Sequence, residues 1–348
     1  MMSRTLLKTG IGLALRATSG DRLIGALSGV TRLPLVVGYH RVVDRMPAAR
    51  PAVIEPMFAS RQMFERQLDW IGQRYRFVSL DELGARLESV ERCEEPIASV
   101  TFDDGYRDVY EHAFPVLMRK GIPAAVFVVT DWLEAGDLLP HDRLYFLLAR
   151  SWPRSRDVLA RLGVVRPRWE GPKSPFEALR LLLTGRAQEE LGRVIAALEE
   201  QATLENAEVE SVQPLTWEMV DRMHKAGVTI GSHTRSHAVL TQEARPRQLD
   251  ELTSSRHVLE QRLGTRIEHL AYPDGAFDTQ VVSAAATAGY RFAYTTCRHR
   301  HTTRPLLTIP RRILWENTCL DAGGRFSGAV MSCVTRGVFD LAGCPRTH

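Results

Sequence analysis

The sequence contains no run of about 20 apolar residues, so it offers no segment that could span a membrane as a helix. It also lacks a basic cluster. Its 45 lysines and arginines are spread along the chain against 41 acidic residues, for a formal net charge of +4, which does not indicate a nucleic-acid-binding protein. None of the five cysteines has CxxC spacing, which argues against a disulfide framework or a cysteine zinc site and is typical of a reducing compartment.

The N-terminal segment, residues 1–33, lacks a convincing secretory cleavage site. Its uncharged stretch from Thr9 to Leu15 is short and ends at Arg16. Because basic residues alternate there with leucines, the segment is either an amphipathic helix lying on a membrane surface or one packed on the domain. We predict a cytoplasmic protein in peripheral contact with the inner membrane through residues 1–30, with export as the alternative.

Strands alternate with helices along most of the chain. Short apolar runs that read as strands follow helical stretches ending in glycine, as in WEMVDRMHKAG before VTIGS. The expected strands are LVVGY (35–39), IASV (97–100), AAVFVV (124–129), VTIGS (228–232), IEHLAY (267–272) and RFAYTT (291–296). This rhythm predicts an α/β fold with a parallel sheet, either closed into a barrel or open and doubly wound.

One segment, about residues 138–212, interrupts the rhythm with several helical stretches, one of which starts at the capping box Ser174-Pro175-x-Glu177. We interpret it as a helical insertion that acts as a lid or an outer support. The predicted organisation is an N-terminal segment (1–33), a catalytic domain (34–316) with this insertion, and a C-terminal extension (317–348) with one terminal helix.

Two adjacent aspartates stand where the expected strand at residues 97–100 ends, in TFDDGY (101–106). Ligands of α/β folds lie at the carboxyl ends of strands, and there Asp103 and Asp104 can reach one cavity in different roles. The alternative is a solvated Asp-Gly turn in which one carboxylate caps the next helix.

Two histidines follow another expected strand, in GSHTRSH (231–237). His233 and His237 have the spacing that places two imidazoles on one face of a helical turn. Two histidines and one carboxylate form a three-ligand set for zinc or a related divalent metal, with positions left for water and substrate. A pair of surface histidines is the alternative.

These motifs together resemble the polysaccharide deacetylase family, the NodB-like carbohydrate esterases. The resemblance extends over about residues 35–314, without the insertion, and includes VVGYHRVVD, which is similar to bacterial exopolysaccharide N-deacetylases. It implies an irregular parallel (β/α) barrel in which Asp103 is the catalytic base. It also implies that Asp104, His233 and His237 bind one divalent metal, most simply zinc, with cobalt or nickel as alternatives.

The resemblance implies further site residues. The strand end LAYPDG supplies a turn in which the N–H group of Asp274 is the candidate oxyanion donor, and Tyr272, Pro273 and Gly275 are candidate substrate-binding residues. The turn departs from the commoner family pattern, because tyrosine precedes the proline and no arginine stands just before it. We expect Arg311 or Arg312 to supply the missing cation.

His40, which ends the first strand, is the candidate general acid for the departing amine. His299 and His301, in CRHRH, are rivals for that role, and a hydrogen-bonded core histidine is the structural alternative for His40.

We therefore predict a metal-dependent hydrolase that removes N-acetyl groups from an amino-sugar polysaccharide or a lipid-linked glycan precursor. Two alternatives remain open at this point. One is a catalytically silent, metal-containing carbohydrate-binding module, against which the retained Asp103 speaks. The other is a ureide or amide hydrolase on the same barrel.

Overall fold

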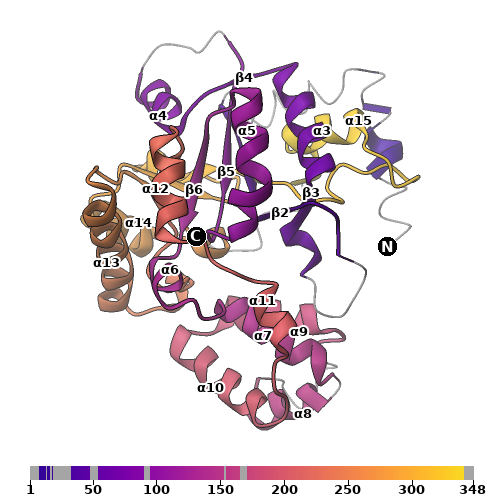
Figure 1. The fold of residues 1–348 in the computed structure, drawn as a ribbon, viewed down its shortest axis with the longest axis vertical. Coiled ribbons are helices and arrows are strands. Elements are labelled where there is room, and N and C mark those ends of the chain that lie inside the picture. The colour runs from indigo at the N-terminus through magenta and orange to yellow at the C-terminus, as the bar shows by residue number, and fades with distance from the viewer. Residues whose placement is uncertain are drawn as a thin grey trace.

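The structure, a computed structural model, describes residues 8–12, 14–15, 18, 33–47, 54–89, 95–152, 154–164 and 171–340. Its centre is a curved parallel sheet with helices around the outside (Figure 1). In spatial order the strands are β10 (Ile309–Pro310), β9 (Phe292–Thr295), β8 (His269–Ala271), β7 (Thr229–Ser232), β6 (Ala124–Val128), β5 (Ile97–Phe102), β1 (Leu35–Tyr39) and β11 (Arg312–Ile313). Every neighbouring pair in this order is parallel.

The two ends of this strand order are joined by a single residue. Ile309 pairs with Tyr294 of β9, whereas Arg312 pairs with Val37 of β1, and only Arg311 separates β10 from β11. One short stretch of chain therefore bridges both edges of the sheet, and the sheet closes into an irregular eight-stranded barrel. The predicted barrel is confirmed, and the alternative of an open doubly wound sheet is wrong.

Two further strand pairings lie beside the barrel. β4 (Arg76–Phe77) pairs with the amino end of β5, and β2 (Arg41–Val43) pairs with β3 (Phe58–Ser60) in a separate parallel ribbon. The ribbon directly follows β1, so it lies beyond the carboxyl end of that strand.

The helices around the barrel begin and end at expected signals. Ser60, Ser79 and Thr216 each accept a backbone N–H as helix N-caps, and Gly121 and Gly264 end helices in the left-handed conformation. The helices are α3 (Arg61–Gly72), α4 (Leu80–Glu88), α5 (Phe114–Lys120), α6 (Thr130–Ala135), α12 (Trp217–Lys225), α13 (Arg245–Leu263) and α14 (Thr279–Thr287). Short single-turn elements are η2 (Glu55–Met57), η3 (Val109–Ala113), η4 (Leu240–Gln242), η5 (Pro273–Gly275), η6 (Pro305–Leu307) and η7 (Val338–Asp340).

The segment expected to be a helical insertion contains five helices that gather below the barrel in Figure 1. They are α7 (Pro140–Arg150), α8 (Arg154–Arg161), α9 (Pro175–Gly185), α10 (Gln188–Glu199) and α11 (Asn206–Glu210). Their apolar faces bury leucines against one another, among them Leu147, Leu182 and Leu198, so the insertion has a core of its own that continues into that of the barrel.

The two ends of the described chain lie close together. The side chain of Lys8 stands over the ring of Phe339, and Gly12 lies against α15 (Gly328–Thr335). The rest of the predicted membrane-surface segment falls largely outside the described residues. Among the helices that the structure describes, none is both long and apolar enough to cross a bilayer.

Candidate active site

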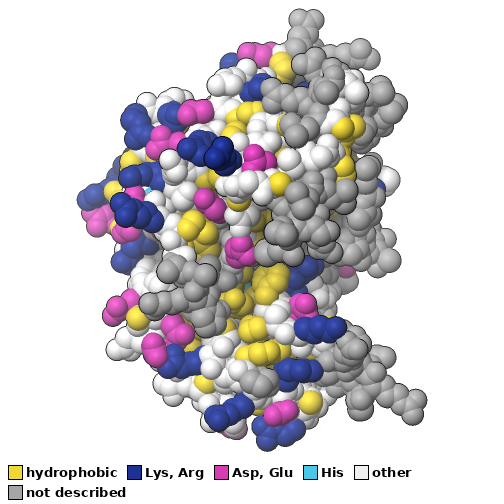
Figure 2. All heavy atoms as spheres, turned by 90° about the vertical axis from the view of Figure 1, so that its right-hand side faces the viewer, with side chains coloured by type: hydrophobic (Ala, Val, Ile, Leu, Met, Phe, Trp, Pro, Cys, Tyr) yellow, Lys and Arg dark blue, Asp and Glu magenta, His cyan; other side chains and the backbone are white. Residues whose placement is uncertain are grey.

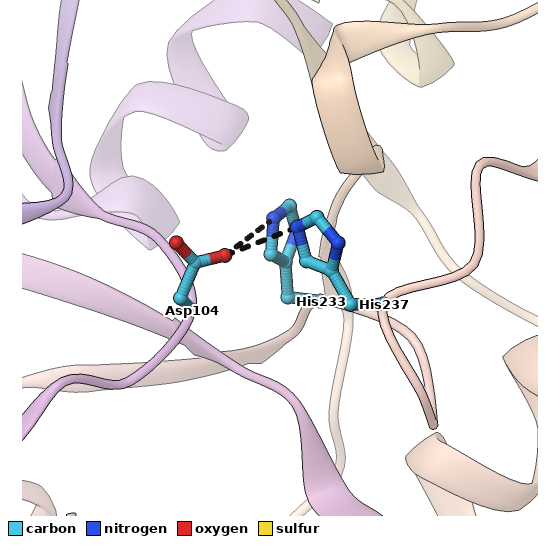
Figure 3. A group of neighbouring side chains, drawn as sticks. All are labelled: Asp104, His233 and His237. Atoms are coloured by element: carbon cyan, nitrogen blue, oxygen red, sulfur yellow. Dashed lines mark ion pairs between the residues drawn. The ribbon is translucent and has the colours of Figure 1, made fainter. Parts of the chain in front are cut away.

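Asp104, His233 and His237 meet at the carboxyl ends of β5 and β7. The Nε2 atoms of the two histidines lie 3.4 and 3.2 Å from Oδ1 of Asp104, and the three side chains point toward one another (Figure 3). Asp104 and His233 are almost fully buried, and the side chain of His237 is 11% exposed. The sequence prediction that these three side chains share one site agrees with this geometry.

The histidine pair does not lie on a helical turn, contrary to the sequence-based expectation. Residues 233–237 form a loop in which Thr234 and His237 have positive φ angles, 68° and 60°. This backbone brings the two rings to 5.0 Å between centroids. The two histidines therefore lie side by side as predicted, but a loop with left-handed residues brings them together and not a helical turn.

Strained backbone is concentrated at this rim of the barrel. Among the described residues, four non-glycine residues have positive φ: Asp104, Thr234, His237 and Asp274. Each follows a strand end, and two of them are candidate metal ligands. Left-handed conformations are uncommon for such residues and cluster at functional sites, where the surrounding structure holds them in place.

The donor set fits a divalent cation. Both carboxylate oxygens of Asp104 are buried without a hydrogen-bond partner among the described residues, which is costly unless a cation binds there. Burial opposes a charge on His233, yet the neighbouring carboxylates of Asp104 and Asp103 raise its pKa, so the site attracts positive charge. Two imidazole nitrogens and one carboxylate oxygen are zinc-type ligands.

Two contacts orient the histidines. Nδ1 of His233 lies 2.8 Å from the carbonyl oxygen of Ala271, to which it donates, so Nε2 keeps its lone pair for a metal. Glu251, buried on α13, accepts from the N–H groups of Arg235 and Ser236, at 3.0 and 2.8 Å, directly before His237. Sequence reasoning missed Glu251, whose only signal is a charge on the buried face of a helix.

Asp103 is held by an arginine and not by the histidines. Arg311 donates from Nη1 and Nη2 to its two carboxylate oxygens, at 2.6 and 2.7 Å, and also from Nη1 to Thr101. Burial alone would raise the pKa of Asp103, but the charge and hydrogen bonds of Arg311, together with the charges of His233 and His40, outweigh burial and lower it. Arg311 is buried, whereas Arg312 is half-buried on β11, so Arg311 is the arginine that reaches Asp103.

His40 lies at the same rim. It is half-buried, and its charge contributes to lowering the pKa of both Asp103 and Asp104. Its Nδ1 atom has no hydrogen-bond partner among the described residues, so this atom is not engaged as it would be in a hydrogen-bonded core histidine. The rivals His299 and His301 lie in the loop after β9, where His301 contacts Thr303 and Arg304.

The turn after β8 differs in part from expectation. Asp274 is exposed with a φ of 56°, and Pro273 and Gly275 are buried in the same turn. Tyr272 is fully buried, and its hydroxyl donates to the carbonyl oxygen of Leu307 at 3.0 Å. Its side chain is therefore part of the core and is not available to a substrate, which corrects that part of the prediction.

The helical insertion reaches the site through two residues that the sequence did not single out. The Tyr106 hydroxyl donates to Oδ2 of Asp142 at 2.7 Å and lies 2.9 Å from Nε2 of His141. The His141 ring lies 4.8 Å from that of His237. Burial raises the pKa of Asp142 to about 7 and lowers that of His141 to about 3.

Comparison with known proteins agrees with this site. A family model described as polysaccharide deacetylase matches residues 91–293. The chain belongs to the polysaccharide deacetylase family. Deacetylases of the NodB type depend on a metal, and Asp104, His233 and His237 are a possible site for one in this chain.

Individual relatives are distant. The chain is 20% identical over 237 residues to "Putative polysaccharide deacetylase YxkH" of Bacillus subtilis (strain 168), which aligns over 68% of this chain and 58% of its own length. The fold is similar to that of the Streptococcus pyogenes deacetylase PplD in complex with acetate (TM-score 0.54, 18% identity, 84% and 95% of the two chains). It is also similar to IcaB from Ammonifex degensii (TM-score 0.52, 20% identity, 87% and 97% of the two chains).

Proposed function

We propose that this protein removes N-acetyl groups from amino-sugar residues of an exopolysaccharide or of its lipid-linked precursor, with one divalent metal held by Asp104, His233 and His237. The observation that carries the proposal is the division of roles between adjacent aspartates. Asp104 faces two histidines, whereas Asp103 is bound by Arg311 outside that ligand set. A hydrolase that activates water needs both kinds of carboxylate.

Each residue then has one role. When bound, the metal polarises the acetyl carbonyl and acidifies water. Asp103 accepts the proton of the attacking water, and Arg311 keeps it ionised and aligned for this. The N–H group of Asp274 is the proposed donor to the oxyanion. His40 gives a proton to the nitrogen as the C–N bond breaks, so that acetate and a free amine leave.

Zinc is the metal we propose, because nitrogen and carboxylate ligands in a three-residue set are typical of catalytic zinc, and the same set accepts cobalt or nickel. The test is acetate release from N-acetylated oligosaccharides and from a lipid-linked N-acetyl sugar, with and without a chelator, followed by addition of single metals. Release that survives complete metal removal contradicts metal dependence. Metal binding without release from any acetylated glycan supports the carbohydrate-binding module instead, and release from cyclic ureides alone supports the ureide hydrolase.

We further propose a cytoplasmic location with peripheral contact between residues 1–30 and the inner membrane, which rests on the amphipathic sequence of that segment. Fractionation of cells expressing the full chain tests this. Recovery of a shortened chain from the periplasm contradicts it.

A further inference from the structure

A cavity of about 210 Å³ lies where the ribbon of β2 and β3 faces the helical insertion. Its apolar wall comes from Val43, Ile54 and Phe58 on the barrel side and from Phe146 of α7 on the insertion side. Figure 2, which views the molecule from the right-hand side of Figure 1, shows hydrophobic side chains gathered in the middle, at the height where the insertion below meets the barrel above. The cavity is small, so it suits one ring-sized group and not a long chain segment.

The cavity is adjacent to the metal-ligand set without being part of it. Asp142 lines the cavity and accepts from the Tyr106 hydroxyl, and its neighbour His141 places its ring against His237. Tyr106 and His141 thus connect the lining of the cavity to the candidate metal ligands through direct contacts. None of the three ligands lines the cavity, so a group in it is not the acetyl group under attack but can be the part of the substrate next to it.

The polar groups of the cavity favour an uncharged occupant. Arg41 is already neutralised by Asp108, 2.6 Å away, and its guanidinium lies over the rings of Phe58 and Tyr106. Two groups remain. Asp142 uses only Oδ2 for Tyr106, and the exposed Arg45 has no ion-pair partner among the described residues.

These two remaining groups restrict the chemistry of the occupant. Asp142 in its ionised form repels an anion, Arg45 repels a cation, and an alkyl chain would leave both groups without hydrogen bonds. A sugar ring satisfies all the groups at once, because its hydroxyls bind carboxyl and guanidinium groups while its C–H face packs on Phe58 or Phe146.

We propose that this cavity is a subsite for a neutral sugar ring next to the N-acetylated residue, so that the helical insertion selects glycans of at least two residues. The inference rests on the proposed deacetylase function. Phe146 and Arg45 are then specificity residues for the sugar that follows the reacting one.

The experiment measures kcat/KM for acetate release from N-acetylglucosamine and its oligomers of two to four residues, in both β-1,4 and β-1,6 linkage. In the natural protein the value should rise by about tenfold or more on going from one residue to two or more, as expected for one added sugar contact. Phe146→Ala and Arg45→Ala should lose most of this rise. Leu162→Ala, at an exposed position of the insertion, is the matched control and should keep it.

Each other outcome is decisive. A rise that persists in both cavity variants, or no rise in the natural protein, overturns the subsite while leaving deacetylation intact. Preference for a disaccharide whose second ring is a uronic acid overturns the neutral occupant. Absence of acetate release from every substrate overturns the proposed function instead. Circular dichroism of each variant, together with its activity on the single sugar or on the best oligomer, shows whether it has folded.

Discussion

Arg311 binds Asp103 through two hydrogen bonds from the one residue that separates the two ends of the barrel sheet. Its N–H group donates to the carbonyl oxygen of Thr295 at the end of β9, while the next residue pairs with β1. Barrel closure and orientation of the candidate base therefore depend on the same short stretch. A bidentate, buried contact of this kind fixes a carboxylate more firmly than a lysine could.

Removing the Arg311 guanidinium should change the pH dependence of the reaction. In Arg311→Met, burial of Asp103 is no longer offset by the charge and hydrogen bonds of Arg311, so the pKa of Asp103 should rise. On acidification, activity should therefore be lost at a higher pH than in the natural protein. Breaking a buried pair also costs about 3–5 kcal/mol of unfolding free energy. Profiles of kcat/KM against pH and denaturant titrations measure the two effects. Arg312→Met, half-buried on β11, is the control, and an unmoved acid limb in Arg311→Met contradicts the role.

Glu251 should control metal affinity from outside the ligand set. Glu251→Gln keeps the size of the side chain but replaces the charged carboxylate that accepts the N–H groups of Arg235 and Ser236. These hydrogen bonds should weaken, and the strained loop that carries His237 should loosen. Such outer contacts are typically worth about 10–100-fold in metal affinity. Competition with a chromogenic chelator measures this. Glu260→Gln, on the same helix and paired with Arg256, should leave affinity unchanged.

His40 should matter most when the leaving group is poor. His40→Gln should lower the rate of amide hydrolysis by ~10²–10⁴-fold, because the departing amine needs a proton. The same variant should hydrolyse an aryl acetate at nearly the natural rate, since a phenolate leaves without one. Equal losses on both substrates would contradict a general-acid role, and bound metal should be measured alongside to exclude damage to the ligand set.

Much of the site could be predicted from sequence because its residues follow recognisable strand ends. Asp103, Asp104 and His233 directly extend β5 and β7, and parallel strands bring their carboxyl ends to one rim. The choice between Arg311 and Arg312 could not be predicted, because adjacent residues point to opposite faces and the register of a two-residue strand leaves no pattern.

The contacts made by the insertion also could not be predicted from local sequence patterns. His141 and Asp142 open α7 in a segment without strand periodicity, and their partners lie 35 residues or more away in the chain. Tyr272 was misassigned for a similar reason, since its hydroxyl partner Leu307 comes from a distant turn. Packing between remote segments decides such cases.

Asp142 should make stability depend on pH. Its pKa is about 7 in the folded protein because of burial and near 3.8 when exposed, so the folded state holds this proton more tightly. The stabilisation that this group contributes is fully present below about pH 4 and is lost as the pH rises through about 7. The loss amounts to about 2–4 kcal/mol of unfolding free energy. Asp142→Asn should flatten that decline in Tm. Asp157→Asn, exposed on α8, should not, and an equal decline in all three proteins contradicts the assignment.

The paired aspartates should respond differently to the same substitution. Asp103→Asn should keep metal affinity almost intact, because the three ligands remain, while activity falls by ~10²–10⁴-fold for want of a base. Asp104→Asn replaces an anionic ligand by a weak neutral one, so bound metal should fall first and activity should partly recover at high metal concentration. Bound metal and acetate release, measured side by side, separate the two. Equal metal loss in both variants would show that Asp103 is itself a ligand, whereas small, similar effects on activity would indicate a solvated turn.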